Sequence, residues 1–255
     1  YMRFCRILFF HKKSTIFRLF FIILLGSLIF SNTTYQYYLG HYQLVPNVFT
    51  WLLILCQDIT TGVYLIPIIY TAILFFCIEV FTRDTFVTLR FLSIKDKYYF
   101  LLNYSLLLPF LFVFLLMCLV FLMGLVNSFS FSISSIHQPL LSEVYEISYV
   151  SNFQSILLPL FSFLCYLIFL SEIALFNFLL FQKGSTVMAN LFSFLLIQSV
   201  FWFYPINATI SQVLPIHHYI LKSVSYHKEL LYWLILLLFF ILLNLYKIRN
   251  TEWEE

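Results

Sequence analysis

Charged side chains are scarce in this sequence: Asp, Glu, Lys and Arg together make up 10% of the 255 residues. Soluble domains usually contain roughly 25% charged residues. Hydrophobic residues make up 62% of the chain. This composition excludes an ordinary soluble domain and predicts a polytopic membrane protein. The net charge of +3 reflects where the basic residues lie between apolar runs, so we do not interpret it as nucleic-acid binding.

The motifs of several enzyme classes are also absent. There is no GxxxxGK[ST] phosphate-binding loop, because Lys183-Gly-Ser-Thr186 has the wrong order and no glycine loop before it. The sequence has no HExxH, no GxSxG and no EExxxR pattern. Glu143 and Glu146 are three residues apart but lack a nearby His-rich helix. We therefore expect no catalytic residue and no bound cofactor in this chain.

No metal or disulfide pattern is present either. The five cysteines have no CxxC or CxxxC spacing, and we interpret them as small apolar fillers. The adjacent His217 and His218 would point to different faces of a helix, which disfavours a metal site built on the pair.

Six apolar runs are each long enough for a bilayer crossing, which takes about 20 residues. They lie at about 14–30, 51–80, 98–127, 151–181, 187–204 and 230–246. They predict an all-α integral membrane protein with six transmembrane helices in a single domain over residues 1–255. The run 51–80 exceeds one crossing, and we expect it to tilt or to bend at Gly62 and Pro67.

The basic residues predict the topology. Twelve of the 14 Lys and Arg lie in four places: before or at the start of the first run, between the second and third runs, between the fourth and fifth runs, and after the sixth run. The other two are Lys222 and Lys228. Because basic loop residues stay on the cytoplasmic side, both termini are expected in the cytoplasm of a multi-pass protein of the cell membrane. An odd number of spans would break this alternation.

Two cytoplasmic segments have helical patterns. Residues 3–13 alternate basic and bulky apolar positions, which fits either an amphipathic elbow helix before the first span or a plain basic flank. Residues 79–97 contain no Pro or Gly, and Val87, Phe91 and Ile94 follow i, i+4, i+7 spacing. This predicts a short amphipathic helix with a charged face. It is either a docking helix for a cytosolic partner or a solvated loop.

The second segment resembles the coupling helix of bacterial ABC-2-type permeases. Their pattern is a Glu at the end of span two, then Gly-Thr, a Leu, and a Pro-Ile-Ser-Arg-like turn with a basic cluster. This sequence has Glu79, Asp84-Thr85, Leu89, and Ser93-Ile94-Lys95 followed by Lys97. The Gly and the Pro of the pattern are absent. The resemblance extends over the whole chain in topology and over residues 79–97 in motif.

The resemblance implies a transport function that depends on other subunits. The residues expected to dock a partner are Glu79, Arg83, Asp84, Leu89, Arg90, Ser93 and Lys95. The implied partners are a cytosolic ABC ATPase that binds ATP and Mg, a second permease protomer, identical or different, and membrane lipid. The implied cargo is amphipathic or hydrophobic and is exported, with peptides favoured, as in resistance to antimicrobial peptides or lantibiotic immunity. The alternative is an ATP-independent protein, a secondary carrier or an assembly or anchoring factor, which would need no docking helix.

Two acidic residues in the spans are candidates for a conduit. An ionisable group within a bilayer normally faces the bundle interior or water. Asp58 lies near the outer end of its run. Its position fits either an outer vestibule or an exposed helix start. Glu172 is the deepest, and Ser162 and Cys165 share its helix face. That polar stripe fits a conduit, a contact with a second protomer, or a protonated, hydrogen-bonded structural glutamate.

Two external segments are expected to lie outside the spans. The segment 31–50 is rich in aromatic residues and predicts a loop at the membrane interface. The segment 205–229, with Pro205 and Pro215, predicts a re-entrant or interfacial hairpin that caps the exit.

Overall fold

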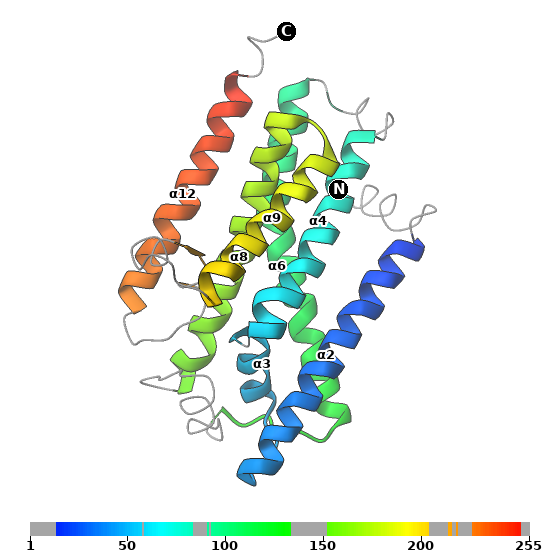
Figure 1. The fold of residues 1–255 in the computed structure, drawn as a ribbon, viewed down its shortest axis with the longest axis vertical. Helices are drawn as coiled ribbons and strands as arrows, with labels where there is room; N and C mark the ends of the chain where they lie inside the picture. Colours follow the sequence, from blue (N-terminus) through cyan, green and yellow to red (C-terminus); the bar gives the residue numbers. More distant parts are fainter. Residues whose placement is uncertain are drawn as a thin grey trace.

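The described part of the chain is helical. The computed structural model describes residues 14–57, 59–83, 91, 93–133, 152–203, 214–215, 218 and 226–250. These residues form seven α-helices and one π-helix, η1. Their arrangement is shown in Figure 1. Their one β feature is an isolated bridge between Asn47 and Ser130. The elements are α2 (Ser14–Tyr42), α3 (Val48–Gln57), η1 (Ile59–Leu65), α4 (Ile66–Arg83), α6 (Ile94–Val126), α8 (Asn152–Phe181), α9 (Gly184–Phe203) and α12 (Tyr226–Asn250).

Four of the described helices are long and apolar enough to cross a membrane. They are α6, α8, α9 and α12, with apolar stretches over Ile94–Val126, Ile156–Phe181, Gly184–Phe201 and Lys228–Asn250. The expected all-α class is confirmed, and the chain is a membrane protein. Shorter apolar helices cover Val48–Gln57 and Ile66–Ile78. The count of six spans stays a prediction.

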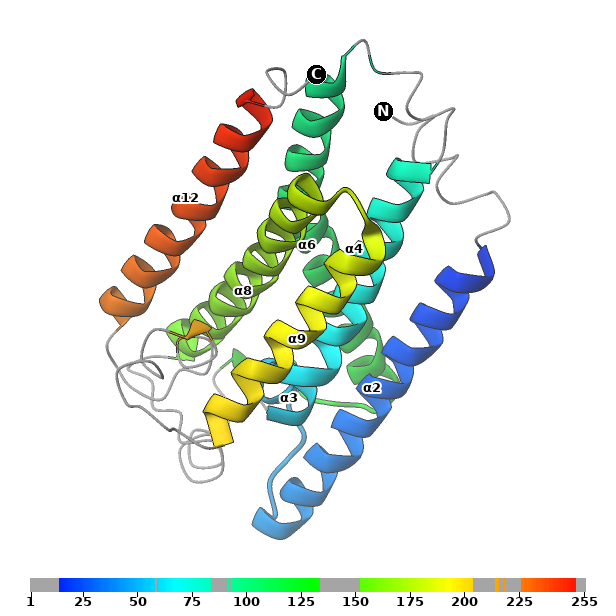
Figure 2. The same cartoon turned by 45° about the horizontal axis from the view of Figure 1, so that its top comes forward.

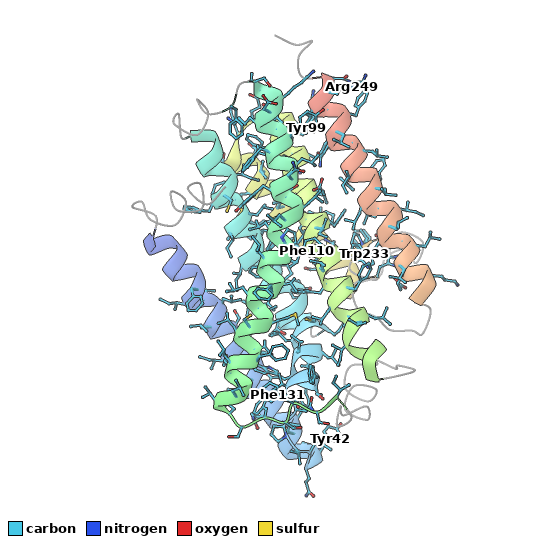
Figure 3. All side chains as sticks on the ribbon, turned by 180° about the vertical axis from the view of Figure 1, so that it is seen from behind. Tyr42, Tyr99, Phe110, Phe131, Trp233 and Arg249 are labelled. Carbon is cyan, nitrogen blue, oxygen red and sulfur yellow. The ribbon has the colours of Figure 1, made fainter. Side chains whose placement is uncertain are left out.

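Helix α8 lies at the centre of the bundle. It packs against α6, α9 and α12, and also against α3 and α4 (Figure 2). In its apolar stretch 67% of the residues are buried, against 17% in α12. Leu234, Leu238 and Leu242 of α12 are exposed, as is Phe110 on α6 (Figure 3). These apolar side chains are placed to face lipid, and a polar group on α8 is placed to face other helices.

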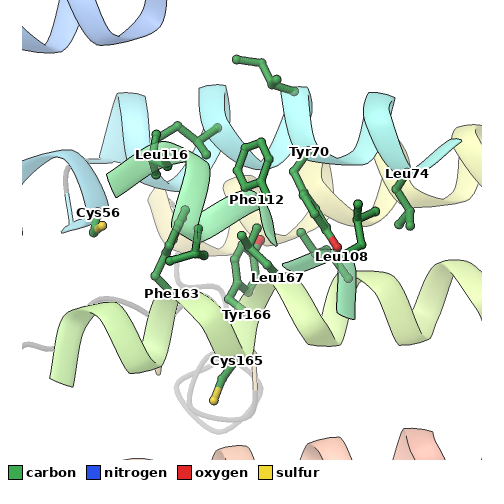
Figure 4. Packing of buried hydrophobic residues seen from close by; sticks show 14 of the residues in the cluster. Cys56, Tyr70, Leu74, Leu108, Phe112, Leu116, Phe163, Cys165, Tyr166 and Leu167 are labelled. Carbon is green, nitrogen blue, oxygen red and sulfur yellow. The ribbon is translucent and has the colours of Figure 1, made fainter. Parts of the chain in front are cut away.

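The core between α4, α6 and α8 is aromatic (Figure 4). Tyr70 and Phe112 pack edge to face with ring centroids 5.1 Å apart, and Tyr166 and Leu167 of α8 are fully buried. Rigid rings of this kind fill the space between helices with little rotamer freedom, which fixes the positions of the polar groups beside them.

The helix ends that lie beside basic residues are found together at one end of the bundle. The first residues of α2 and α6, the last residues of α4 and α12, and the α8–α9 connection all lie towards one end of the bundle (Figures 1 and 2). The basic residues in these segments are Arg18, Arg83, Lys95, Lys97, Lys183, Lys247 and Arg249. The fold thus brings together, at one end, segments that the sequence assigns to the cytoplasm.

The apolar run 51–80 is broken into α3, η1 and α4. Gly62 lies so close to the end of α3 that a Cβ atom on it would be 2.3 Å from the Cys56 carbonyl oxygen. Thr61 Oγ1 donates to the Leu55 carbonyl oxygen at 3.3 Å. Pro67 is the second residue of α4 and follows η1 directly, so its missing N–H interrupts the helical hydrogen bonds at this junction. The expected irregularity at Gly62 and Pro67 therefore takes the form of a π-helix.

The expected loop over 31–50 is mostly helical, so that prediction is wrong. Helix α2 continues to Tyr42, and the connection to α3 is short. Tyr35 is fully buried, and its hydroxyl accepts a hydrogen bond from the Asn47 backbone N–H at 3.0 Å. Asn47 Oδ1 in turn accepts from the Thr50 N–H and caps α3. These contacts hold the end of α2 against the start of α3, and the aromatic belt at the membrane interface stays a prediction.

The orientation is tested by labelling single cysteines in a cysteine-free variant. Gly40 lies near the end of α2 and Asn250 at the end of α12. We expect Gly40→Cys to react with a membrane-impermeant maleimide in intact cells, and Asn250→Cys to react only after permeabilisation. Permeabilised cells, in which both sites should react, are the control. Labelling of Asn250→Cys from outside would reverse the orientation.

Candidate functional site: a buried carboxyl group between three helices

Glu172 on α8 is fully buried and is held by two neighbouring helices. Ser105 of α6 lies with its Oγ 2.7 Å from Glu172 Oε1. Asn244 of α12 donates from Nδ2 to Glu172 Oε2 at 2.8 Å and to the Glu172 carbonyl oxygen at 3.1 Å. The carboxyl group therefore connects the central helix to α6 and α12.

The partners of Glu172 are as deeply placed as Glu172 itself. Ser105 is 4% exposed and Asn244 is 0% exposed. Sequence reasoning missed both residues. Asn244 carried a usable signal, because it is the one acidic or amide residue in the apolar run 230–246. An amide in such a run is expected to face another polar group within the bundle. Ser105 has no comparable signal, because a serine can satisfy its hydroxyl within its own helix.

Two further hydrogen-bonded pairs connect α4 to α8 and to α6. The Tyr70 hydroxyl of α4 is hydrogen-bonded to Ser171 Oγ of α8. On α6, the Tyr104 hydroxyl donates to Cys77 Sγ of α4 at 3.3 Å. Buried polar contacts of this kind fix the helices in one arrangement, because a broken pair would leave polar atoms without partners.

A small cavity adjoins these polar groups. Its volume is about 10 Å³, room for about one water molecule. The cavity is lined by Leu74, Ile78, Leu101, Tyr104, Ser105, Ser171 and Leu175. Glu172 itself does not line it, but its partner Ser105 does.

No ion pair of Glu172 is found among the described residues. The carboxyl group is held by a hydroxyl and an amide, which are neutral groups. A different ionisable pair lies near the start of α12, where His218 Nδ1 and Glu229 Oε2 are 2.6 Å apart. The His218 ring also stacks on Tyr232 at 3.5 Å.

The polar stripe on α8 faces neighbours from the same chain. Ser162, Cys165 and Glu172 are 2%, 3% and 0% exposed. Ser162 Oγ donates to the His218 carbonyl oxygen at 3.1 Å. The conduit role of Glu172 stays a prediction. Asp58, the other conduit candidate, lies outside the described residues.

The expected docking residues are divided between two helices and the segment between them. Glu79 and Arg83 belong to the last turns of α4. Ser93 is the N-cap of α6 and accepts a hydrogen bond from the Asp96 N–H at 3.1 Å, and Lys95 lies in the first turn of that helix. The predictions for Asp84, Leu89 and Arg90 fall outside the described residues. So do those for the elbow helix at 3–13 and for most of the cap at 205–229.

Comparison of the chain with known protein families, with curated proteins and with solved structures gave no match.

Proposed function

We propose that this chain is the membrane-spanning permease subunit of an ABC-type exporter, driven by ATP that a separate subunit hydrolyses. The observation that carries the proposal is the arrangement of α4 and α6: α4 ends and α6 begins at the basic end of the bundle (Figure 1). The connection covers residues 84–93. It is too short for a domain, but a helix of ten residues spans about 15 Å and is long enough to dock a partner.

The buried site supplies a route from this connection into the bundle. Ser93 caps α6 and so fixes where that helix begins. Ser105 lies on the same helix and contacts Glu172 of α8, which in turn contacts Asn244 of α12. In the proposed mechanism, a displacement of the α4–α6 connection by the ATPase moves α6, and the buried contacts pass the movement to α8 and α12. Glu172 holds helices together in this mechanism and does not contact cargo.

The lipid-facing surface supports an amphipathic or hydrophobic cargo. Helices α9 and α12 expose leucine, isoleucine and phenylalanine side chains along their outer faces. A peptide with an apolar face would pass along such a surface, or between two protomers, without requiring a water-filled pore. We propose an amphipathic peptide as the cargo. If such peptides were not transported, polysaccharides, lipids and small drugs would remain as candidate cargo classes.

One observation favours the ATP-independent alternative. A buried acidic side chain between three helices is an arrangement that proton-coupled carriers also use. A secondary carrier would need Glu172 but would not need an ATPase at the α4–α6 connection. The two functions are therefore separated by a test at that connection.

The docking test uses a double substitution. Replacing Arg83 and Asp84 with alanine is expected to reduce the copurifying ATPase about tenfold, which corresponds to about 1.4 kcal/mol of binding free energy. The measurement is ATPase activity in the affinity-purified complex. The control is Lys228→Ala, which removes an exposed charge at the opposite end of the bundle. An unchanged amount of ATPase in the double variant, or no ATPase with the wild-type chain, would contradict the exporter function and favour the secondary carrier.

A further inference from the structure

The hydrogen bonds around Glu172 bear on whether its carboxyl group carries a proton. Ser105 Oγ lies 2.8 Å from the Leu102 carbonyl oxygen and 2.7 Å from Glu172 Oε1. A serine hydroxyl has one hydrogen and donates one full hydrogen bond. A carbonyl oxygen and an ionised carboxylate only accept. With Glu172 ionised, two acceptors would therefore compete for a single hydrogen.

A proton on Glu172 resolves this competition. If Oε1 carries the proton, it donates to Ser105 Oγ, and Ser105 donates to the Leu102 carbonyl oxygen. The two hydrogens of Asn244 Nδ2 then go to Glu172 Oε2 and to the Glu172 carbonyl oxygen, as the distances of 2.8 and 3.1 Å indicate. Every short contact then has one donor and one acceptor.

The described residues give Glu172 no ion pair. Among the described residues its contacts are the hydroxyl of Ser105 and the amide of Asn244. The titratable groups on the helices around it include Tyr70 and Cys77 on α4, Tyr104 on α6, and Lys247 one turn after Asn244 on α12. Tyrosine and cysteine add no positive charge, and the side-chain partners of Glu172 among the described residues are the neutral groups of Ser105 and Asn244. An unpaired carboxylate at 0% exposure is the arrangement that buried sites avoid.

We propose that Glu172 is a proton-binding site: its carboxyl group holds a proton shared with Ser105 Oγ, and the neutral acid ties α6, α8 and α12 together. Ser105 also lines the small cavity beside this site. The inference concerns the chain itself and does not depend on an ATPase partner.

Infrared spectroscopy of the full-length protein in detergent at neutral pH tests the proposal. The spectrum of wild type minus Glu172→Gln is expected to contain the C=O stretching band of an un-ionised carboxylic acid, and that band should shift in D₂O. The matched control is Asp96→Asn, which removes an exposed carboxyl group at the start of α6. Its difference spectrum is expected to contain a carboxylate band instead. A carboxylate band, or no acid band, in the Glu172→Gln difference would overturn the proposal.

A second variant tests where the proton lies. Ser105→Ala removes the hydrogen-bond acceptor and keeps a residue that suits a helix. The acid band of Glu172 is expected to persist and to move to higher frequency, because its O–H group loses a partner. If the band keeps its position, the sharing with Ser105 is wrong. If the band disappears while the protein remains folded, Glu172 does not hold the proton without Ser105, and the proposed site is likewise overturned.

Discussion

Replacing Glu172 with alanine is expected to destabilise the folded bundle by about 3 kcal/mol, the range for an emptied core position that also leaves a buried polar group without its partner. Asn244 Nδ2 would lose its bond to the carboxyl group, and α6 would lose its polar link to α8. The measurement is the unfolding midpoint of the purified protein in detergent, followed by circular dichroism.

The matched variant is Glu172→Gln, which keeps the volume of the side chain. Its amide oxygen accepts from Asn244 and its NH₂ group donates to Ser105, so the loss is expected to stay below about 1 kcal/mol. We expect a smaller loss of stability for Glu172→Gln than for Glu172→Ala because the carboxyl group at position 172 is a neutral acid. Equal destabilisation by Gln and Ala would show that a negative charge contributes to the site, and would contradict the hydrogen-bond assignment made from Ser105.

Replacing Gly62 with alanine is the second substitution with a large expected effect. The added Cβ atom would lie 2.3 Å from the Cys56 carbonyl oxygen and 2.8 Å from that of Leu55. Both are backbone atoms, so the end of α3 and the π-helix must move apart. Overpacking of this kind is expected to cost about 3 kcal/mol. The measurement is the folded fraction by size-exclusion chromatography and the unfolding midpoint in detergent.

The control for this variant is Gly26→Ala on α2. A Cβ atom on Gly26 would have no heavy atom within 4 Å, and alanine favours helix by about 1 kcal/mol relative to glycine. Gly26→Ala is therefore expected to fold as well as wild type or better. If Gly62→Ala were as stable as Gly26→Ala, the junction between α3 and η1 would tolerate a side chain, and its close packing would not be required.

The sequence alone predicted the class of the protein and the grouping of its helix ends. Apolar runs predict helices because every backbone polar group in lipid must be satisfied within its own segment. The described helices α8 and α9 begin and end within three residues of the expected runs 151–181 and 187–204. The basic segments meet at one end of the bundle because the alternation of crossings is a property of the chain order.

Other features depended on contacts that no local pattern contains. Residues 31–42 read as a loop, but the buried Tyr35 and its bond to Asn47 extend α2 to Tyr42. Ser93 was expected in a docking helix, but its side chain caps α6. In both cases a tertiary or capping hydrogen bond decided where a helix begins or ends, and composition does not record such a bond.

Glu172 shows most clearly which features the sequence determined and which required the tertiary structure. From the sequence it was the deepest acidic residue, placed on a polar stripe of unknown partner. Only the fold brought Ser105, 67 residues before it, and Asn244, 72 residues after it, within hydrogen-bond distance. Hydropathy and helical periodicity are properties of neighbouring residues, so they placed the carboxyl group within a predicted span. The choice between a conduit and a closed contact between three helices depends on which distant segments pack against α8, and that is set by the tertiary structure.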